Sequence, residues 1–164
     1  MANLQMNNPH QHPCKRKRSH TGFSLVELLM AVCIVSILGA IAFPAYTSYL
    51  ARGFRAEARA QLQLAAQYMQ RFHAANDSYA ADRAGKGIGE IMPPQFMQSP
   101  AQGQPVYRIE FVEGQSTASA TGFRLVMSPV AGGRMAADEC GGFSLDSFGR
   151  RGITGGGSRE ACWR

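Results

Sequence analysis

The feature that most constrains this chain is an uncharged apolar stretch from Leu28 to Leu50, with one carboxylate, Glu27, at its head. A helix over this stretch is about 34 Å long, enough to cross a hydrocarbon core of about 30 Å. A carboxylate inside a membrane costs about 2.5–3.5 kcal/mol even on lenient scales. Glu27 therefore needs a partner, or it lies at headgroup depth as an acid favoured by the positive end of the helix.

The charge before the apolar stretch predicts its orientation. Four basic residues, 15–18, precede it, and the first 26 residues contain no acidic side chain. This asymmetry places the N-terminus in the cytoplasm and the residues after Leu50 outside. The formal net charge is +6, but these four residues supply much of it, since 13 basic side chains face 11 acidic ones in the rest of the chain. We expect one exported domain of ordinary size.

A short motif joins the basic run to the apolar stretch: Gly22-Phe23-Ser24-Leu25-Val26-Glu27. An ordinary secretory signal is cut after its apolar region, whereas here the matching signature lies ahead of it. The motif resembles the class III signal of type IV pilins and their relatives. The resemblance implies that a prepilin peptidase cuts between Gly22 and Phe23 and N-methylates Phe23. It also implies that the new ammonium group of Phe23, from the same or a neighbouring subunit, pairs with Glu27 during assembly.

Helical periodicity continues beyond the apolar stretch and predicts one helix from about Ser24 to about His73. Asn76-Asp77-Ser78 supplies the stop. Pro44 removes a backbone donor inside this helix, so we expect a kink or a loosened turn there, and the pilins that it resembles carry a proline at the matching place. The second half of the helix has one apolar stripe, formed by Phe54, Ala58, Leu62, Ala65, Met69 and Phe72.

The rest of the chain predicts strands. Apolar and polar residues alternate over 106–111, 123–128 and 143–146, and a return strand is expected around 151–154. An antiparallel meander of these strands would cover the helix stripe, which gives an α+β fold: a long N-terminal helix on a small antiparallel sheet. Residues 77–104 read as a connecting loop with room for one short helical turn, and in the family this loop contacts neighbouring subunits. Its glycine-rich piece lacks the pattern of a phosphate-binding loop.

These predictions divide the chain into four parts. Residues 1–22 are a basic leader that is removed, and residues 23–50 are the helix that spans the membrane and then lies in the filament core. Residues 51–75 are the half of the helix that packs on the exported domain. Residues 76–164 hold the loop, the sheet and the C-terminal region.

The four cysteines fall in different compartments. Cys14 lies in the leader and Cys33 inside the span, where a free cysteine behaves as a small apolar residue. Cys140 and Cys162 are exported, and an oxidising exterior favours a disulfide that would add about 3 kcal/mol of stability. A metal site is the alternative for this pair, and it is weak without a nearby histidine. In type IV pilins such a disulfide bounds the C-terminal region.

Two other functions were weighed from the residues. His73 and Asp77 could face each other across a helical turn, but no nucleophile motif accompanies them, so we predict neither an enzyme nor a cofactor. Arginines suggest DNA binding, although solvated or lipid-facing charge ranks above it because no aromatic platform is apparent. These arginines form a helix stripe and a C-terminal group: Arg52, Arg55, Arg59, Arg150, Arg151, Arg159 and Arg164.

The resemblance extends to the C-terminus, where the run from Cys140 to Gly149 and the pair Cys162-Trp163 look like minor pilins of the PilE type. It implies a structural subunit of a type IV pilus, with a major pilin or a type II secretion pseudopilin as alternatives and a DNA-binding pilin ranked lower. The implied partners are other pilin subunits, the prepilin peptidase, the inner-membrane assembly machinery and, before assembly, membrane lipid. The implied location is the inner membrane, with an exported domain in the periplasm, and then the pilus.

Overall fold

The computed structural model describes residues 22–164. The basic run 15–18, Cys14 and the rest of the expected leader before Gly22 lie outside the described residues. The chain divides into two compact units, residues 1–42 and 43–164.

One long helix, α1 (Leu25–Asn76), accounts for the first half of the described chain. In residues 22–42 its apolar side chains are exposed, and among the described residues it is the one helix long and apolar enough to cross a membrane. The helix continues through Pro44, whose carbonyl accepts hydrogen bonds from the hydroxyls of Thr47 and Ser48 at 3.0 Å each. The kink expected at Pro44 stays a prediction. Asp77, with a φ of 58°, ends α1 where the sequence predicts the stop.

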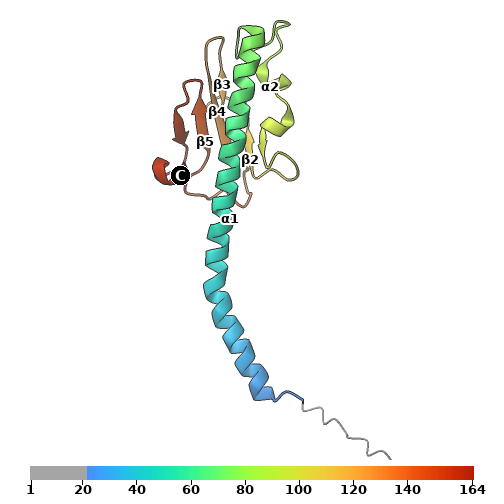
Figure 1. Cartoon of the computed structure of the whole chain (residues 1–164), viewed down its shortest axis with the longest axis vertical. Helices are drawn as coiled ribbons and strands as arrows, with labels where there is room; N and C mark the ends of the chain where they lie inside the picture. The colour runs from blue at the N-terminus through green and yellow to red at the C-terminus, as the bar shows by residue number, and fades with distance from the viewer. Residues whose placement is uncertain (1–21) are drawn as a thin grey trace, which may run out of the picture. The chain divides into compact units, whose positions relative to one another are not determined.

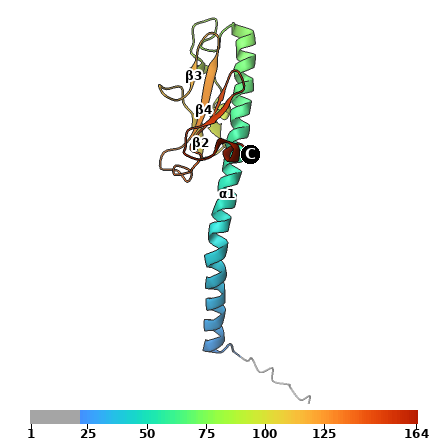
Figure 2. The ribbon, with the colours of Figure 1, turned by 90° about the vertical axis from the view of Figure 1, so that its left-hand side faces the viewer.

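In residues 43–164, α1 packs on an antiparallel sheet with strand order β1-β2-β4-β5-β6, and β3 pairs with β4 (Figure 1). The ribbon turned by 90° shows the sheet against one side of this part of α1 (Figure 2). Four strands match the prediction, with ends differing by up to two residues, and the α+β fold class is confirmed. The strands are β1 (Gln98–Ser99), β2 (Tyr107–Ile109), β3 (Thr117–Ala118), β4 (Phe123–Pro129), β5 (Phe143–Asp146) and β6 (Arg151–Ile153).

The core lies between the helix stripe and one face of the sheet. On the helix, Ala58, Leu62, Ala65, Met69 and Phe72 are buried, as predicted, and Phe54 packs at the edge. The sheet contributes the alternating members of β2, β4 and β5 to this core, because successive side chains of a strand point to opposite faces. They are Tyr107, Ile109, Phe123, Leu125, Met127, Phe143 and Leu145, while Val126 and Ser144 between them are buried as well.

The segment expected as a loop contains more structure than predicted. It holds α2 (Ile88–Ile91), a 3-10 helix at Pro94–Phe96 and the two-residue strand β1. Strands of two residues, such as β1 and β3, are too short to show an alternating pattern, so periodicity misses them. A last short helix, α3 (Arg159–Cys162), is capped by the hydroxyl of Ser158.

Ser116 fills a gap in the hydrogen bonding of β4. On this side of β4, β2 pairs with residues 127–129 and β3 with residues 123–124, which leaves Val126 without a backbone partner. The buried Ser116 hydroxyl accepts from the Val126 amide at 2.9 Å and lies 3.4 Å from its carbonyl. The Ser116 hydroxyl thus replaces a backbone hydrogen bond of the sheet between the residues that pair with β2 and those that pair with β3.

We expect Ser116→Ala to lower the free energy of unfolding by about 1–3 kcal/mol, because it leaves the buried Val126 amide without an acceptor. Urea unfolding of the full chain in detergent micelles measures this change. Ser119→Ala is the matched control, because Ser119 is exposed and water can replace its hydroxyl. Equal stability of the two variants would contradict the assigned role of Ser116.

Candidate functional site

The predicted processing and assembly residues lie at the start of α1. Phe23 is 81% exposed, and the Ser24 hydroxyl accepts from the Val26 amide at 3.3 Å, just before the helix begins. Glu27 is exposed in the first helical turn, at the positive end of the helix dipole. Cleavage after Gly22, methylation of Phe23 and the pairing of Glu27 remain predictions.

The C-terminal segment is held to the domain by a disulfide, as predicted. Cys140 and Cys162 are bonded at 2.03 Å and both are buried. The next residue, Trp163, donates from its indole nitrogen to the Gly152 carbonyl at 2.9 Å and packs edge-on against Phe143. Cys33 is free and exposed. The last residues of the chain are therefore fixed against the edge strand β6.

The arginines of the helix stripe do not act as one group. Arg55 makes a bidentate ion pair with Asp138, with a shortest distance of 2.5 Å, and a second contact with Glu139 at 3.3 Å. The hydrogen bond to Asp138 raises the pKa of Arg55 although burial opposes it. The interpretation of this side chain as solvated or lipid-facing charge is wrong.

Arg59 is structural as well. Its guanidinium donates to the carbonyls of Cys162, at 2.9 Å, and of Arg164. Burial lowers the pKa of Arg59, and the nearby Arg55 and Arg151 lower it further. The interpretation as free charge is wrong here too. Within residues 22–164, Arg52 is the stripe arginine that forms neither an ion pair nor a side-chain hydrogen bond.

A second basic region surrounds the turn between β5 and β6, residues 146–150, called here the β5–β6 turn. Arg150 belongs to this turn and Arg151 follows it as the first residue of β6. Arg124 on β4 lies opposite Asp146 in the register of β4 and β5. Arg124 is on the sheet face turned away from α1, because its neighbours Phe123 and Leu125 are buried against the helix. Strand pairing thus brings Arg124 beside a turn more than 20 residues later, which sequence reasoning missed.

Asp146 fixes the backbone of the β5–β6 turn. Its carboxylate accepts from the amides of Phe148 and Arg150 at 3.0 and 2.9 Å and from the Arg150 guanidinium at 2.5 Å. Burial alone would raise the pKa of Asp146, but these hydrogen bonds lower it. Asp146 is therefore ionised at neutral pH, and its carboxylate supports the backbone of the turn.

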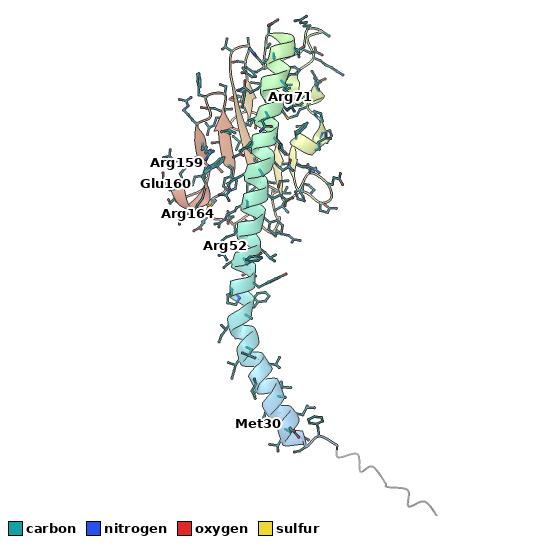
Figure 3. The ribbon with its side chains drawn as sticks, viewed as in Figure 1. Met30, Arg52, Arg71, Arg159, Glu160 and Arg164 are labelled. Carbon is teal, nitrogen blue, oxygen red and sulfur yellow. A yellow bond between two sulfur atoms is a disulfide. The ribbon has the colours of Figure 1, made fainter. Side chains whose placement is uncertain are left out.

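Two aromatic side chains accompany these arginines. Phe148, at the tip of the turn, is 82% exposed, and the Arg150 guanidinium lies 5.3 Å from its ring centre. Arg151 lies in the same way over Trp163, at 5.1 Å. The expectation that the chain offers no aromatic platform near its basic residues is wrong. Figure 3 places Arg159 and Arg164 at the end of the domain nearer Arg52, and Arg71 at the other end.

A shallow groove of about 340 Å³ runs beside the turn. Its lining combines two guanidiniums, those of Arg124 and Arg150, with the hydroxyl-bearing residues Thr117, Ser119 and Ser147. Such groups bind phosphate oxygens. The single carboxylate in the lining, Asp146, is already engaged by Arg150.

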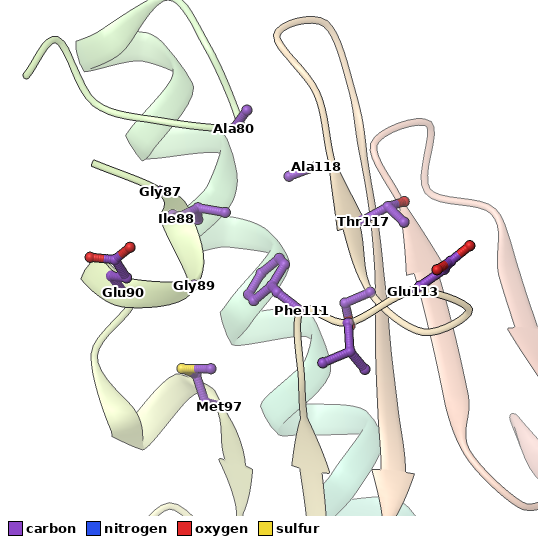
Figure 4. Close-up of a pocket in the computed structure, with 12 residues that line it drawn as sticks. Ala80, Gly87, Ile88, Gly89, Glu90, Met97, Phe111, Glu113, Thr117 and Ala118 are labelled. Atoms are coloured by element: carbon purple, nitrogen blue, oxygen red, sulfur yellow. The ribbon is translucent and has the colours of Figure 1, made fainter. Parts of the chain in front are cut away.

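A larger groove of about 600 Å³ has a different chemical character. It lies between α2 and the segment from β2 to β3, and Figure 4 shows Phe111 in its middle with Glu90 and Glu113 on either side. Both charged side chains in the lining are acidic. This groove therefore repels phosphate groups.

The described residues contain no cluster that could hold a metal ion, since no three His, Cys, Asp or Glu side chains within residues 22–164 gather in a suitable way. His73 stacks on Tyr79, with ring centres 4.2 Å apart, while Asp77 contacts Arg83 at 3.4 Å. His73 and Asp77 thus have separate partners.

A long helix, apolar in its first half and covered in its second by an antiparallel sheet with a C-terminal disulfide, defines a type IV pilin-like subunit. Two family models match this chain. The model described as "Type IV minor pilin ComP, DNA uptake sequence receptor" matches residues 44–144, and the "Prokaryotic N-terminal methylation motif" matches residues 17–43. The first match covers more than half of the chain, so the chain belongs to this family of type IV minor pilins.

Known proteins agree with this assignment. The fimbrial protein EcpC of Eikenella corrodens is 31% identical over 83 residues, which are 51% of this chain and 54% of that protein. The type IV major fimbrial protein FimA of Dichelobacter nodosus is 49% identical over 41 residues, 25% of this chain and 26% of that protein. A fimbrial protein of Moraxella nonliquefaciens is 51% identical over 37 residues, 23% of this chain. The chain thus spans about half the length of EcpC and about a quarter of FimA.

As a member of this family, the chain is a structural subunit of the type IV pilin type. Its apolar helix and methylation motif indicate a membrane-anchored precursor that later reaches the pilus surface. The sequence prediction of a minor pilin is confirmed, and the family description gives DNA uptake more weight than the sequence analysis did.

Proposed function

We propose that this minor pilin binds double-stranded DNA at the pilus surface for uptake. The observation that carries the proposal is the match of residues 44–144 to a family described as a DNA uptake sequence receptor. Sequence reasoning ranked this function low because the helix arginines would meet anionic headgroups and no aromatic platform was apparent. The β5–β6 turn has arginines away from the helix stripe and aromatic rings beside them, which supports the proposal.

The cations that DNA would contact are the three arginines around the β5–β6 turn, Arg124, Arg150 and Arg151. Arg124 and Arg151 are exposed and, within residues 22–164, pair with no carboxylate, while Arg150 shares Asp146 with two backbone amides. Phosphate contacts release counterions and so provide most of the non-specific affinity of DNA-binding proteins. Arg55 pairs with Asp138 and Arg59 donates to backbone carbonyls, so neither belongs to the proposed interface.

The N-terminal steps complete the proposal. A prepilin peptidase cuts at Gly22–Phe23 and methylates Phe23, and residues 1–22 leave as the leader. Residues 23–50 hold the precursor in the inner membrane with residues 51–164 in the periplasm, and they then enter the filament core through the assembly machinery. The methylation motif over residues 17–43 and the uncharged helix support these steps.

Arg124→Gln tests the DNA interface. For the full chain in detergent micelles, we expect the logarithm of the affinity for a short duplex to fall with the logarithm of salt concentration. The slope should be shallower by about 0.9 in the variant, because one phosphate contact is lost. Fluorescence anisotropy at several salt concentrations measures both values.

Arg52→Gln is the matched control, because Arg52 is exposed and lies at the opposite end of the domain from the β5–β6 turn, which lines a groove with Gln67 and Gln70 (Figure 3). It should leave the slope unchanged. A weak, salt-independent response of the unmodified chain would reject DNA binding altogether. Equal slopes for both variants would place the interface elsewhere on the domain.

A further inference from the structure

We propose that Phe148 is a wedge that stacks against a base of the bound DNA while the neighbouring groove holds the phosphates. This inference rests on the proposed function and adds the residue that reaches the bases. Phe148 lies outside residues 44–144, so it belongs to a part of this chain that the family match does not cover. The argument therefore depends on the geometry of the β5–β6 turn.

Phe148 is exposed and yet held in place. Its ring is 82% exposed, which leaves a large apolar surface in water. The backbone beneath it is fixed because Asp146 accepts from the amides of Phe148 and Arg150, and the Gly149 amide donates to the Asp146 carbonyl at 2.9 Å. Gly149 has a φ of 77°, a value that favours glycine, and this conformation closes the turn. A side chain presented by a rigid turn loses little entropy on binding.

The surroundings of the ring match a nucleotide. Arg150 lies 5.3 Å from the centre of the Phe148 ring, so an aromatic face and a cation are presented together. Aromatic side chains stack on bases regardless of sequence, because every base has a π-face. Minor-groove proteins insert apolar side chains such as phenylalanine between base steps and partly unstack them.

The groove of about 340 Å³ beside the turn carries groups that bind phosphates, so it can hold the backbone of the DNA strand whose base stacks on Phe148. Phe148 lines this groove together with Arg124, Arg150 and the hydroxyl-bearing Thr117 and Ser119. Phosphate contacts position a protein on DNA, and contacts to the bases add the rest. One end of the sheet, beside the β5–β6 turn, thus offers groups for both parts of a nucleotide.

Phe148→Ala tests the inference with the full chain in detergent micelles. We expect the affinity for duplex DNA to fall about five- to a hundredfold, the range for the loss of one base–aromatic stack. The salt slope should stay unchanged, because Phe148 carries no charge. The unmodified chain should also prefer a duplex with one unpaired base, in which the unstacking energy is already spent, and the variant should lose this preference.

Two variants serve as controls. Phe148→Tyr keeps the ring and should retain the affinity within about twofold. Val112→Ala removes another exposed apolar side chain, 50% exposed beside the acidic groove, and should leave the affinity unchanged. A wedge role requires that both controls behave like the unmodified chain.

The outcomes separate the inference from the proposed function. If the unmodified chain shows no salt-dependent binding, the proposed function fails and the inference fails with it. If binding is salt-dependent but Phe148→Ala keeps both the affinity and the preference for an unpaired base, the inference alone is wrong. Unchanged DNA binding with reduced incorporation of the variant into pili would assign Phe148 to a contact between subunits and overturn the wedge.

Discussion

Asp138→Asn is expected to lower the free energy of unfolding by about 3 kcal/mol. The Asp138 side chain is 6% exposed and accepts hydrogen bonds from two nitrogens of the Arg55 guanidinium and from the Cys140 amide, the last at 3.2 Å. Removing one partner of a buried pair costs about 3–5 kcal/mol, because the other charge is left buried. The lower end of this range applies because Glu139 still contacts Arg55.

Asp77→Asn is the matched control. Asp77 also pairs with an arginine, Arg83, at 3.4 Å, but the two side chains are 86% and 73% exposed. Exposed ion pairs contribute little because water and salt screen them. Urea unfolding of both variants with the disulfide intact should therefore show a large change for Asp138 and none resolvable for Asp77. Equal, small changes would mean that the Arg55–Asp138 pair does not hold the C-terminal region to α1.

Glu27→Ala is expected to reduce incorporation into pili by roughly a hundredfold. If the ammonium of Phe23 pairs with Glu27 in the assembled filament, the variant leaves that cation unpaired in an apolar core. A charge in such surroundings costs about 2.5–3.5 kcal/mol, which corresponds to this factor. Mass spectrometry of sheared, purified pili measures the number of copies and also shows whether Phe23 is methylated.

Glu57→Ala is the control for Glu27→Ala. Glu57 is an exposed acid on the same helix α1, beyond the uncharged stretch. Its removal should leave incorporation unchanged. Normal incorporation of the Glu27 variant would instead support an acid at headgroup depth, stabilised by the helix dipole alone.

Sequence patterns predicted the helix and the strands whose residues repeat with a regular period within one element. Spacings of three and four residues identified the stripe from Ala58 to Phe72, and alternation identified β5 at its observed bounds, because each pattern repeats within one element. The strands β1 and β3 escaped because two residues hold no period. Ser116 could not be found in this way, since its role depends on a gap between two strand pairings.

Arginine pairing shows the same limit at the candidate site. A helix stripe of three arginines was visible in the sequence, but the partner of Arg55 lies 83 residues later and that of Arg59 more than 100 residues later. Whether an arginine is free for DNA depends on such distant partners. The sequence therefore identified candidate arginines for DNA binding, and tertiary contacts decided which of them remain free.

The sequence by itself determined the processing motif, the uncharged helix, the amphipathic half of α1 and the α+β class, because charge, hydrophobicity and periodicity act over neighbouring residues. The tertiary structure decided which arginines remain free, where the exposed Phe148 lies and how Arg124 comes beside it. These relations depend on strand register and on packing between segments far apart in the chain, and no local pattern encodes them.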